Sequence, residues 1–154
     1  MNKNYSKLPV LVMAATALAY ILSSIFAAET ALAQTKEKAR LSRELQRTMS
    51  RETPLAEEDY RTYMANLEAI FSLRQSPERA SEVAAAIPGW SESRFAYVTT
   101  KMAVGMSMLL KPDDPRNAAA PDFAKPDTRE MALIKRHKDE LVKAVESLQA
   151  AQGN

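Results

Sequence analysis

The sequence contains no cysteine, one histidine and only three glycines among its 154 residues. Without cysteine the chain can hold no disulfide bridge, no thiol nucleophile and no thiolate metal site. The one histidine, His137, lacks the second histidine that a helical zinc or di-metal site requires. There is also no glycine-rich phosphate loop and no nucleophile elbow, although two carboxylates that meet in space could still act as acid and base. These absences predict a protein that is not an enzyme.

The N-terminus has the form of a secretory signal peptide. Two lysines precede an apolar run over residues 8–28, and the Ala-Leu-Ala of residues 31–33 places small side chains where a signal peptidase needs them. The basic residues that follow disfavour an uncleaved helix with its C-terminus outside, because positive charge collects on the cytoplasmic side. We therefore predict that residues 1–33 are a signal peptide cleaved after Ala33, and that the mature protein is periplasmic.

Two alternatives to cleavage stay open. The apolar run over residues 8–28 is just long enough to cross a bilayer, which takes about 20 residues. If it is not cleaved, it anchors the protein in the inner membrane with the domain exported. In the reversed orientation the same anchor would leave the domain in the cytoplasm.

Residues 34–154 are long enough for one domain with a modest core. β-Branched residues are sparse, and apolar residues recur at spacings of three and four, which indicates amphipathic helices rather than strands. We predict an all-α fold, a small bundle of four to five largely antiparallel helices that follows the N-terminal signal helix. The predicted helices cover residues 35–51, a long segment from Pro54, residues 77–87, a long segment after Ser91 and residues 128–151.

Capping residues mark where several of these helices should begin. Thr53 suits the N-cap position of the second helix, and Pro54 suits its first helical position. Ser91 can cap the fourth helix in the same way. Asp127 and Glu130 have the spacing of a capping box and predict the start of the last helix.

Residues 111–127 form a proline-rich segment between the last two long helices. They contain four prolines and no helical period, which predicts a loop. A loop of this length in a small domain is either functional or flexible. We expect Phe123 to hold it against the body of the protein.

The first predicted helix carries the excess of positive charge. Residues 35–52 hold six basic and three acidic residues, whereas residues 53–154 hold thirteen basic and fifteen acidic ones. On a helical wheel, five of the basic residues fall within about 80° of one another, opposite a row of apolar residues. The basic row is Lys36, Arg40, Arg43, Arg47 and Arg51, and the apolar row is Leu41, Leu45 and Met49.

Two interpretations of this basic row stay open. It can be a solvated helix face on which Glu37 and Glu44 pair with Arg40 and Arg47. It can also be a surface that binds anionic lipid headgroups or an acidic protein. Our leading prediction is an exported, non-enzymatic binding or accessory protein of the bacterial cell envelope, with a protein partner or an anionic membrane surface as its target. The nearly balanced total charge does not indicate nucleic-acid binding.

The methionines and the histidine support a second hypothesis. Met102 and Met106 are one turn apart on a predicted helix, and thioether sulfurs can bind Cu(I). His137 with a methionine of another helix could supply the axial ligands of a haem in a helix bundle. The same methionines can instead fill gaps in the core, and Gly105 between them would let a neighbouring helix approach closely. We predict core residues and no cofactor, with a metal- or haem-binding bundle as the alternative.

Overall fold

The computed structural model describes residues 31–152, with the side chains from Ala39 to Ala151 apart from Leu41. The predicted signal peptide lies outside this range except for residues 31–33, and so does the alternative membrane anchor over residues 8–28. Within the range the chain forms helices and no strand, which confirms the predicted all-α class. The α-helices are α2 (Ala31–Met49), α3 (Glu57–Ala65), α4 (Leu67–Ser72), α5 (Ala80–Ala86), α6 (Glu92–Leu110), α7 (Pro115–Ala119) and α8 (Thr128–Gln152), and the 3-10 turns are η1 (Pro77–Arg79) and η2 (Asp122–Ala124).

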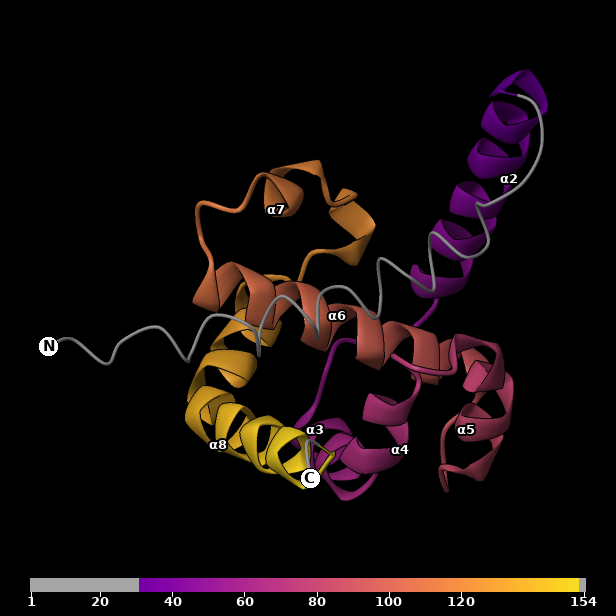
Figure 1. The fold of residues 1–154 in the computed structure, drawn as a ribbon. Coiled ribbons are helices and arrows are strands. Elements are labelled where there is room, and N and C mark those ends of the chain that lie inside the picture. Colours follow the sequence, from indigo (N-terminus) through magenta and orange to yellow (C-terminus); the bar gives the residue numbers. More distant parts are fainter. Residues whose placement is uncertain (1–30, 153–154) are drawn as a thin grey trace, which may run out of the picture.

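Helix α6 lies at the centre of the fold (Figure 1). It packs against α2, α3, α5, α7 and α8 and against the turn η2. The consecutive residues 97–102 are all buried, so every side of the helix is covered along this stretch. The sequence predicts a single apolar face for this segment, and the wider burial brings polar side chains such as Lys101 into the interior.

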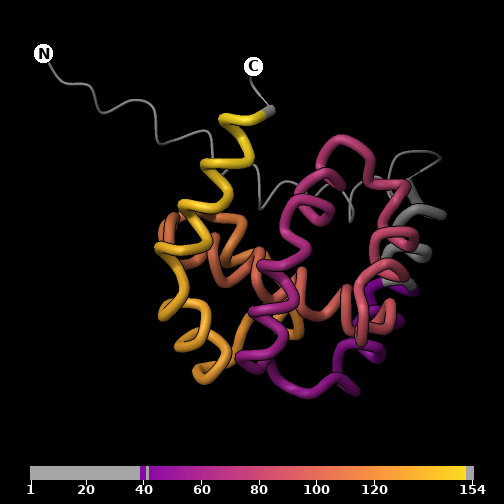
Figure 2. Tube along the Cα trace, turned by 90° about the horizontal axis from the view of Figure 1, so that it is seen from below, coloured from indigo at the N-terminus to yellow at the C-terminus, as the bar shows by residue number. Residues whose placement is uncertain are grey.

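Two clusters of buried apolar side chains form the core. The larger cluster joins α2, α3, α4, α6 and α8, and the smaller cluster joins α4, α5 and the start of α6. Helices α8 and α5 lie on opposite sides of the α3–α4 pair (Figure 2). The described residues of both clusters fall between Leu45 and Leu148, so a chain that starts at Gln34 contains all of them.

Helices α6 and α8 approach each other closely at Gly105, which confirms the role predicted for this glycine. A Cβ atom at this position would lie 2.5 Å from Cδ1 of Ile134 and 3.0 Å from Cγ of Pro126. Contacts this short require one of the groups to move, and the surrounding core is close-packed. The absence of a side chain at Gly105 therefore allows Ile134 to be 1% exposed at the centre of the larger cluster.

The capping residues predicted for α6 and α8 are confirmed. The side-chain oxygen of Ser91 accepts the backbone N–H of Arg94 at 3.0 Å at the start of α6. At the start of α8 the backbone N–H of Glu130 donates to Oδ1 of Asp127 at 2.8 Å, and the N–H of Asp127 donates to Oε2 of Glu130 at 2.9 Å. Both arrangements satisfy N–H groups that have no partner within the helix.

The second predicted helix begins later than expected and is bent. Thr53 is not its N-cap, because α3 starts after Ala56. Residues 53–55 are extended, since their backbone groups bond to distant parts of the chain. At Asn66 the side-chain amide donates to the carbonyl of Thr62 at 2.8 Å, and the backbone leaves helical geometry with φ of −114° and ψ of 14°. This local bond separates α3 from α4.

The proline-rich residues 111–127 contain more helix than predicted. They form α7 and the turn η2, and one of the prolines occupies the first position of α7. Asn117 is buried; its Oδ1 accepts the hydroxyl of Ser107 at 2.7 Å, and its Nδ2 donates to the carbonyl of Lys111 at 2.6 Å. Phe123 packs against the larger core cluster, as expected. The segment is therefore fixed to α6 by specific contacts.

Candidate functional site

Helix α2 projects from the body of the protein, and its C-terminal end packs into the core (Figure 1). Met49 is 2% exposed, and Leu45 is partly buried against the larger core cluster. The other described side chains of α2, which begin at Ala39, are exposed except for the partly buried Thr48. We call α2 and the turn that follows it, residues 31–51, the cationic arm.

Four of the five residues predicted to form the basic row have exposed side chains on this arm. They are Arg40, Arg43, Arg47 and Arg51. The helix ends at Met49, earlier than the predicted end at residue 51, so the last of the four arginines lies in the turn. The side chain of the fifth residue, Lys36, lies outside the described residues. The three arginines on the helix stand on the side opposite to the one that enters the core.

The surroundings of two of these exposed arginines, Arg43 and Arg47, can be described in more detail. Nε of Arg43 donates to the backbone carbonyl of Ala39 at 3.0 Å, which directs this side chain along the arm. Among the side chains described for α2, Glu44 makes no ion pair with Arg47, although their spacing would allow one. The charge of Arg47 is therefore not compensated by the glutamate expected to pair with it.

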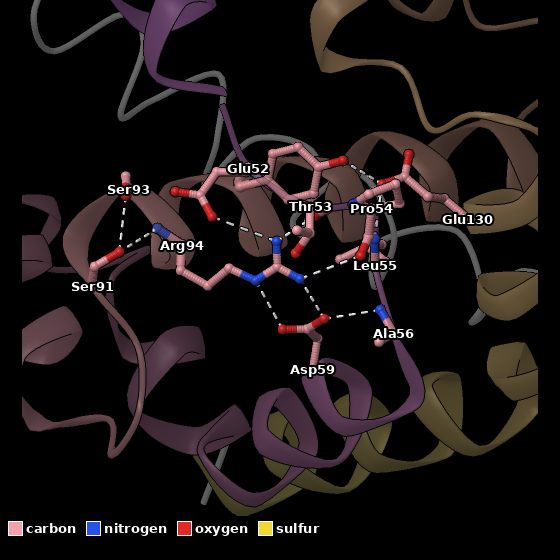
Figure 3. Close-up of polar contacts among 11 residues, drawn as sticks. Glu52, Thr53, Pro54, Leu55, Ala56, Asp59, Ser91, Ser93, Arg94 and Glu130 are labelled. Atoms are coloured by element: carbon pink, nitrogen blue, oxygen red, sulfur yellow. Dashed lines mark hydrogen bonds and ion pairs between the residues drawn. The ribbon is translucent and has the colours of Figure 1, made fainter. Parts of the chain in front are cut away.

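Residues 52–56 form an extended strap that leads from the arm to α3 across α6 and α8. Arg94 of α6 holds the first part of the strap (Figure 3). Its Nε donates to Oδ1 of Asp59 at 2.9 Å, and its two other nitrogens donate to Oδ2 of the same carboxylate and to the carbonyl of Thr53. Glu52 adds an ion pair to Arg94 at 3.5 Å. One guanidinium thus connects the strap to the start of α3.

Glu130 of α8 holds the second part of the strap. Its side chain is 1% exposed, and Oε1 accepts the backbone N–H of Leu55 at 3.0 Å together with the hydroxyl of Tyr97. Oε2 accepts the N–H of Asp127 in the capping box and lies 3.4 Å from Nζ of Lys101. A buried carboxylate is stable only when it is paired and hydrogen-bonded, and these four groups meet that requirement.

Tyr97 lies between the partly buried ion pair of Arg94 with Asp59 and the buried ion pair of Lys101 with Glu130. The guanidinium carbon of Arg94 is 5.1 Å from the centroid of its ring, and Nζ of Lys101 is 5.3 Å from it. Burial, followed by the hydrogen bond to Glu130, raises the pKa of Tyr97. Burial alone would lower the pKa of Arg94, but the hydrogen bonds and charge of Asp59 outweigh this effect and raise it. We call Asp59, Arg94, Tyr97, Lys101 and Glu130 the buried network.

The sequence reasoning missed most of the buried network. It identified Glu130 as a capping residue only, and it did not single out Arg94, Tyr97 or Lys101. The signal that could have found the last three is their spacing of three and four residues, which places them on one side of a helix. Every member of the network is engaged by other groups of the protein, so the arrangement can fix the base of the arm.

The residues of the alternative metal or haem hypothesis lie in different surroundings. Met102 and Met106 are 2% and 7% exposed and belong to the larger core cluster. The ring of His137 stacks on Tyr60 with a centroid distance of 3.8 Å. Its Nε2 lies 2.8 Å from Oε1 of Glu57 but makes no hydrogen bond. None of the contacts described for this histidine is to a methionine, and the hypothesis stays a prediction.

Metal-binding groups and membrane-spanning helices are both absent from the described part of the chain. Within residues 31–152, no group of three or more histidine, aspartate and glutamate side chains could hold a metal ion. Among the helices of this range, none is both long and apolar enough to cross a membrane.

The three described tyrosines should resist ionisation. Burial raises the pKa of Tyr63 to about 12 and also raises those of Tyr60 and Tyr97, whereas the ordinary value is about 10. Because these pKa values are higher in the folded state, the stability that they contribute is complete below about pH 10 and is lost as the pH rises toward 12. An ultraviolet absorbance titration of the chain from Gln34, followed together with circular dichroism, should show ionisation only as the fold is lost. Ionisation of one tyrosine near pH 10 without unfolding would contradict this prediction.

Comparison with known protein families, with curated proteins and with solved structures gives no significant match to this chain. The cationic arm and its anchoring by the strap are thus the features from which a function can be inferred.

Proposed function

We propose that the protein is a non-enzymatic binding protein of the bacterial cell envelope, which attaches to an anionic partner surface through its cationic arm. In this proposal the chain is exported, its signal peptide is removed after Ala33, and the domain works in the periplasm. The observation that carries the proposal is the projecting helix α2, on which exposed arginines stand opposite the side packed into the core.

The distribution of charge supports this assignment. The positive excess is confined to residues 35–52, whereas residues 53–154 contain more acidic than basic residues. A partner surface with negative charge would therefore be attracted to the arm and would find no comparable excess on the rest of the domain. Arginine also suits this role, because its planar fork can make two parallel hydrogen bonds to a carboxylate or a phosphate.

The anchoring of the arm supports a binding role as well. Met49 fixes the end of α2 in the core, and the strap is fixed a few residues later by Arg94 and Glu130. A helix held at its base loses less conformational freedom on binding than a flexible tail of the same charge. The buried charged residues of the network are thereby assigned a structural role, which agrees with a function that needs no catalytic group.

The test is the loss of binding when the charge of the arm is reversed. Cosedimentation of the chain from Gln34 with the envelope fraction of the native host should be abolished by the triple change Arg40→Glu, Arg43→Glu and Arg47→Glu. The melting temperature should not fall, because these side chains are exposed and lie outside both core clusters.

The same fractionation tests the cleavage of the signal peptide. The intact mass of the endogenous protein should correspond to a chain that begins at Gln34.

A matched control separates the arm from net charge. The triple change Arg61→Glu, Lys135→Glu and Lys143→Glu alters the net charge of the protein by the same amount at exposed positions of α3 and α8. It should leave cosedimentation unchanged or nearly so. If the arm variant still sediments with the envelope, or if both triple variants lose binding equally, the arm is not the binding surface.

A further inference from the structure

We infer that the anionic surface bound by the cationic arm is a lipid bilayer, and that the arm binds at the level of the phosphate headgroups without entering the hydrocarbon. This inference rests on the proposed function and narrows it to one class of partner. It follows from what is present on the two sides of α2.

At the base of the arm, the apolar side that could enter a membrane is occupied by the protein itself. An interfacial helix binds by burying its apolar side in the boundary between headgroups and acyl chains. Here Met49 is 2% exposed and Leu45 is packed against the larger core cluster. Two of the three residues of the apolar row are thus held by the body. Among the side chains of α2 that are described, those turned outward are polar apart from Ala39.

The side chains described on the outward side of α2 lack the features of a protein interface. Stable protein interfaces have a buried centre of aromatic or other large apolar residues, with charged groups mostly at the rim. The exposed residues described for α2 include one apolar residue, Ala39, whose methyl group is too small to anchor a partner. The others are Arg40, Ser42, Arg43, Glu44, Gln46 and Arg47. A bilayer surface needs no such anchor, because it offers a dense layer of phosphates to each guanidinium.

The strength of binding expected from this contact is moderate and depends on salt. Each basic residue near an anionic membrane raises the binding constant by about fivefold. Loss of three arginines should therefore weaken binding by about a hundredfold, before any repulsion from the introduced glutamates. Because the side chains are exposed, raising the salt from about 0.1 M to about 1 M shortens the Debye length from about 10 Å to about 3 Å and should release the protein.

The experiment uses protein-free vesicles and the chain from Gln34, since the apolar residues 8–28 would bind lipid by themselves. Sedimentation is measured with vesicles of phosphatidylcholine alone and with an equal mixture of phosphatidylcholine and phosphatidylglycerol. We expect binding to the mixed vesicles only, complete release at about 1 M salt, and about a hundredfold weaker binding for the variant with Arg40→Glu, Arg43→Glu and Arg47→Glu. The variant with Arg61→Glu, Lys135→Glu and Lys143→Glu should bind like the unchanged chain.

Each other outcome overturns the inference in a distinguishable way. If the protein cosediments with the native envelope fraction but not with the mixed vesicles, its partner is an envelope protein, and the proposed function stands without a lipid ligand. If vesicle binding persists at high salt, or if phosphatidylcholine alone suffices, apolar insertion and not headgroup contact holds the protein. If binding survives reversal of the three arginines, another surface contacts the lipid.

Discussion

Glu130→Ala should lower the free energy of unfolding by about 3–5 kcal/mol, because it removes one partner of a buried ion pair. The ammonium group of Lys101, whose side chain is 8% exposed, would lose its carboxylate. The N–H of Leu55 and the hydroxyl of Tyr97 would lose the oxygen to which both donate. This loss is a large part of the stability of a small domain, which is about 5–15 kcal/mol in total. Urea unfolding followed by circular dichroism measures it.

Two further variants separate the ion pair from the volume of the side chain. The double variant Glu130→Leu and Lys101→Met removes both charges and keeps most of the packing. It should recover the part of the loss that comes from the unpaired ammonium, whereas the N–H of Leu55 and the hydroxyl of Tyr97 still lack an acceptor. Arg129→Ala changes the neighbouring exposed residue of α8 and should shift stability by no more than about 0.5 kcal/mol. A loss below about 1 kcal/mol for Glu130→Ala would mean that the network contributes no more than an ordinary hydrogen bond.

The sequence predicted those parts of the fold that depend on neighbouring residues. The caps at Ser91 and Asp127 were correct because a side chain there bonds to an N–H three residues further on. The close approach of another helix at Gly105 was also predictable. A glycine between two methionines on the apolar face of a helix leaves room for a neighbouring helix. The basic row of the arm also follows from helical periodicity. The exposure of its described arginines fits both interpretations of the row, a solvated helix face and a binding surface.

The sequence could not predict the parts that depend on distant residues. Thr53 and Pro54 have the character of a helix start, yet their carbonyls are taken by Arg94, about 40 residues further along the chain. The N–H of Leu55 is taken by Glu130 over a still longer separation. Local propensity favours a helix here by a small free energy. Hydrogen bonds to the partly buried guanidinium of Arg94 and to the buried carboxylate of Glu130 exceed it. The strap and the buried network therefore become visible only when α6 and α8 are placed beside each other.

The strap also determines how the arm is presented. The first anchor of the arm is the last turn of α2, where Met49 is buried and Leu45 is packed against the core. An attachment confined to one turn allows a helix to pivot. The bonds from Arg94 to the carbonyls of Thr53 and Pro54 add a second point a few residues later. Two anchors define a direction, so the guanidinium of Arg94 acts as a positioning group for the arginines of the arm without touching any partner.

Arg94→Ala should therefore both destabilise the protein and broaden the orientations of the arm. The stability loss should be about 3 kcal/mol, because the carboxylate of Asp59, which is 11% exposed in the parent chain, loses its cation. This is the lower end of the range for a buried pair, since the Arg94–Asp59 pair is only partly buried. Spin labels at the exposed positions Ser42 and Lys143 report the orientation of the arm through their distance distribution. We expect a narrow distribution in the parent chain and a broad one after Arg94→Ala, while Arg61→Ala on α3 should change neither stability nor distances.

Arg94→Lys keeps the positive charge but loses the planar fork of the guanidinium, so it should retain more stability and still broaden the distances. An unchanged distribution in both Arg94 variants would show that the packing of Leu45 and Met49 is enough to set the direction of the arm.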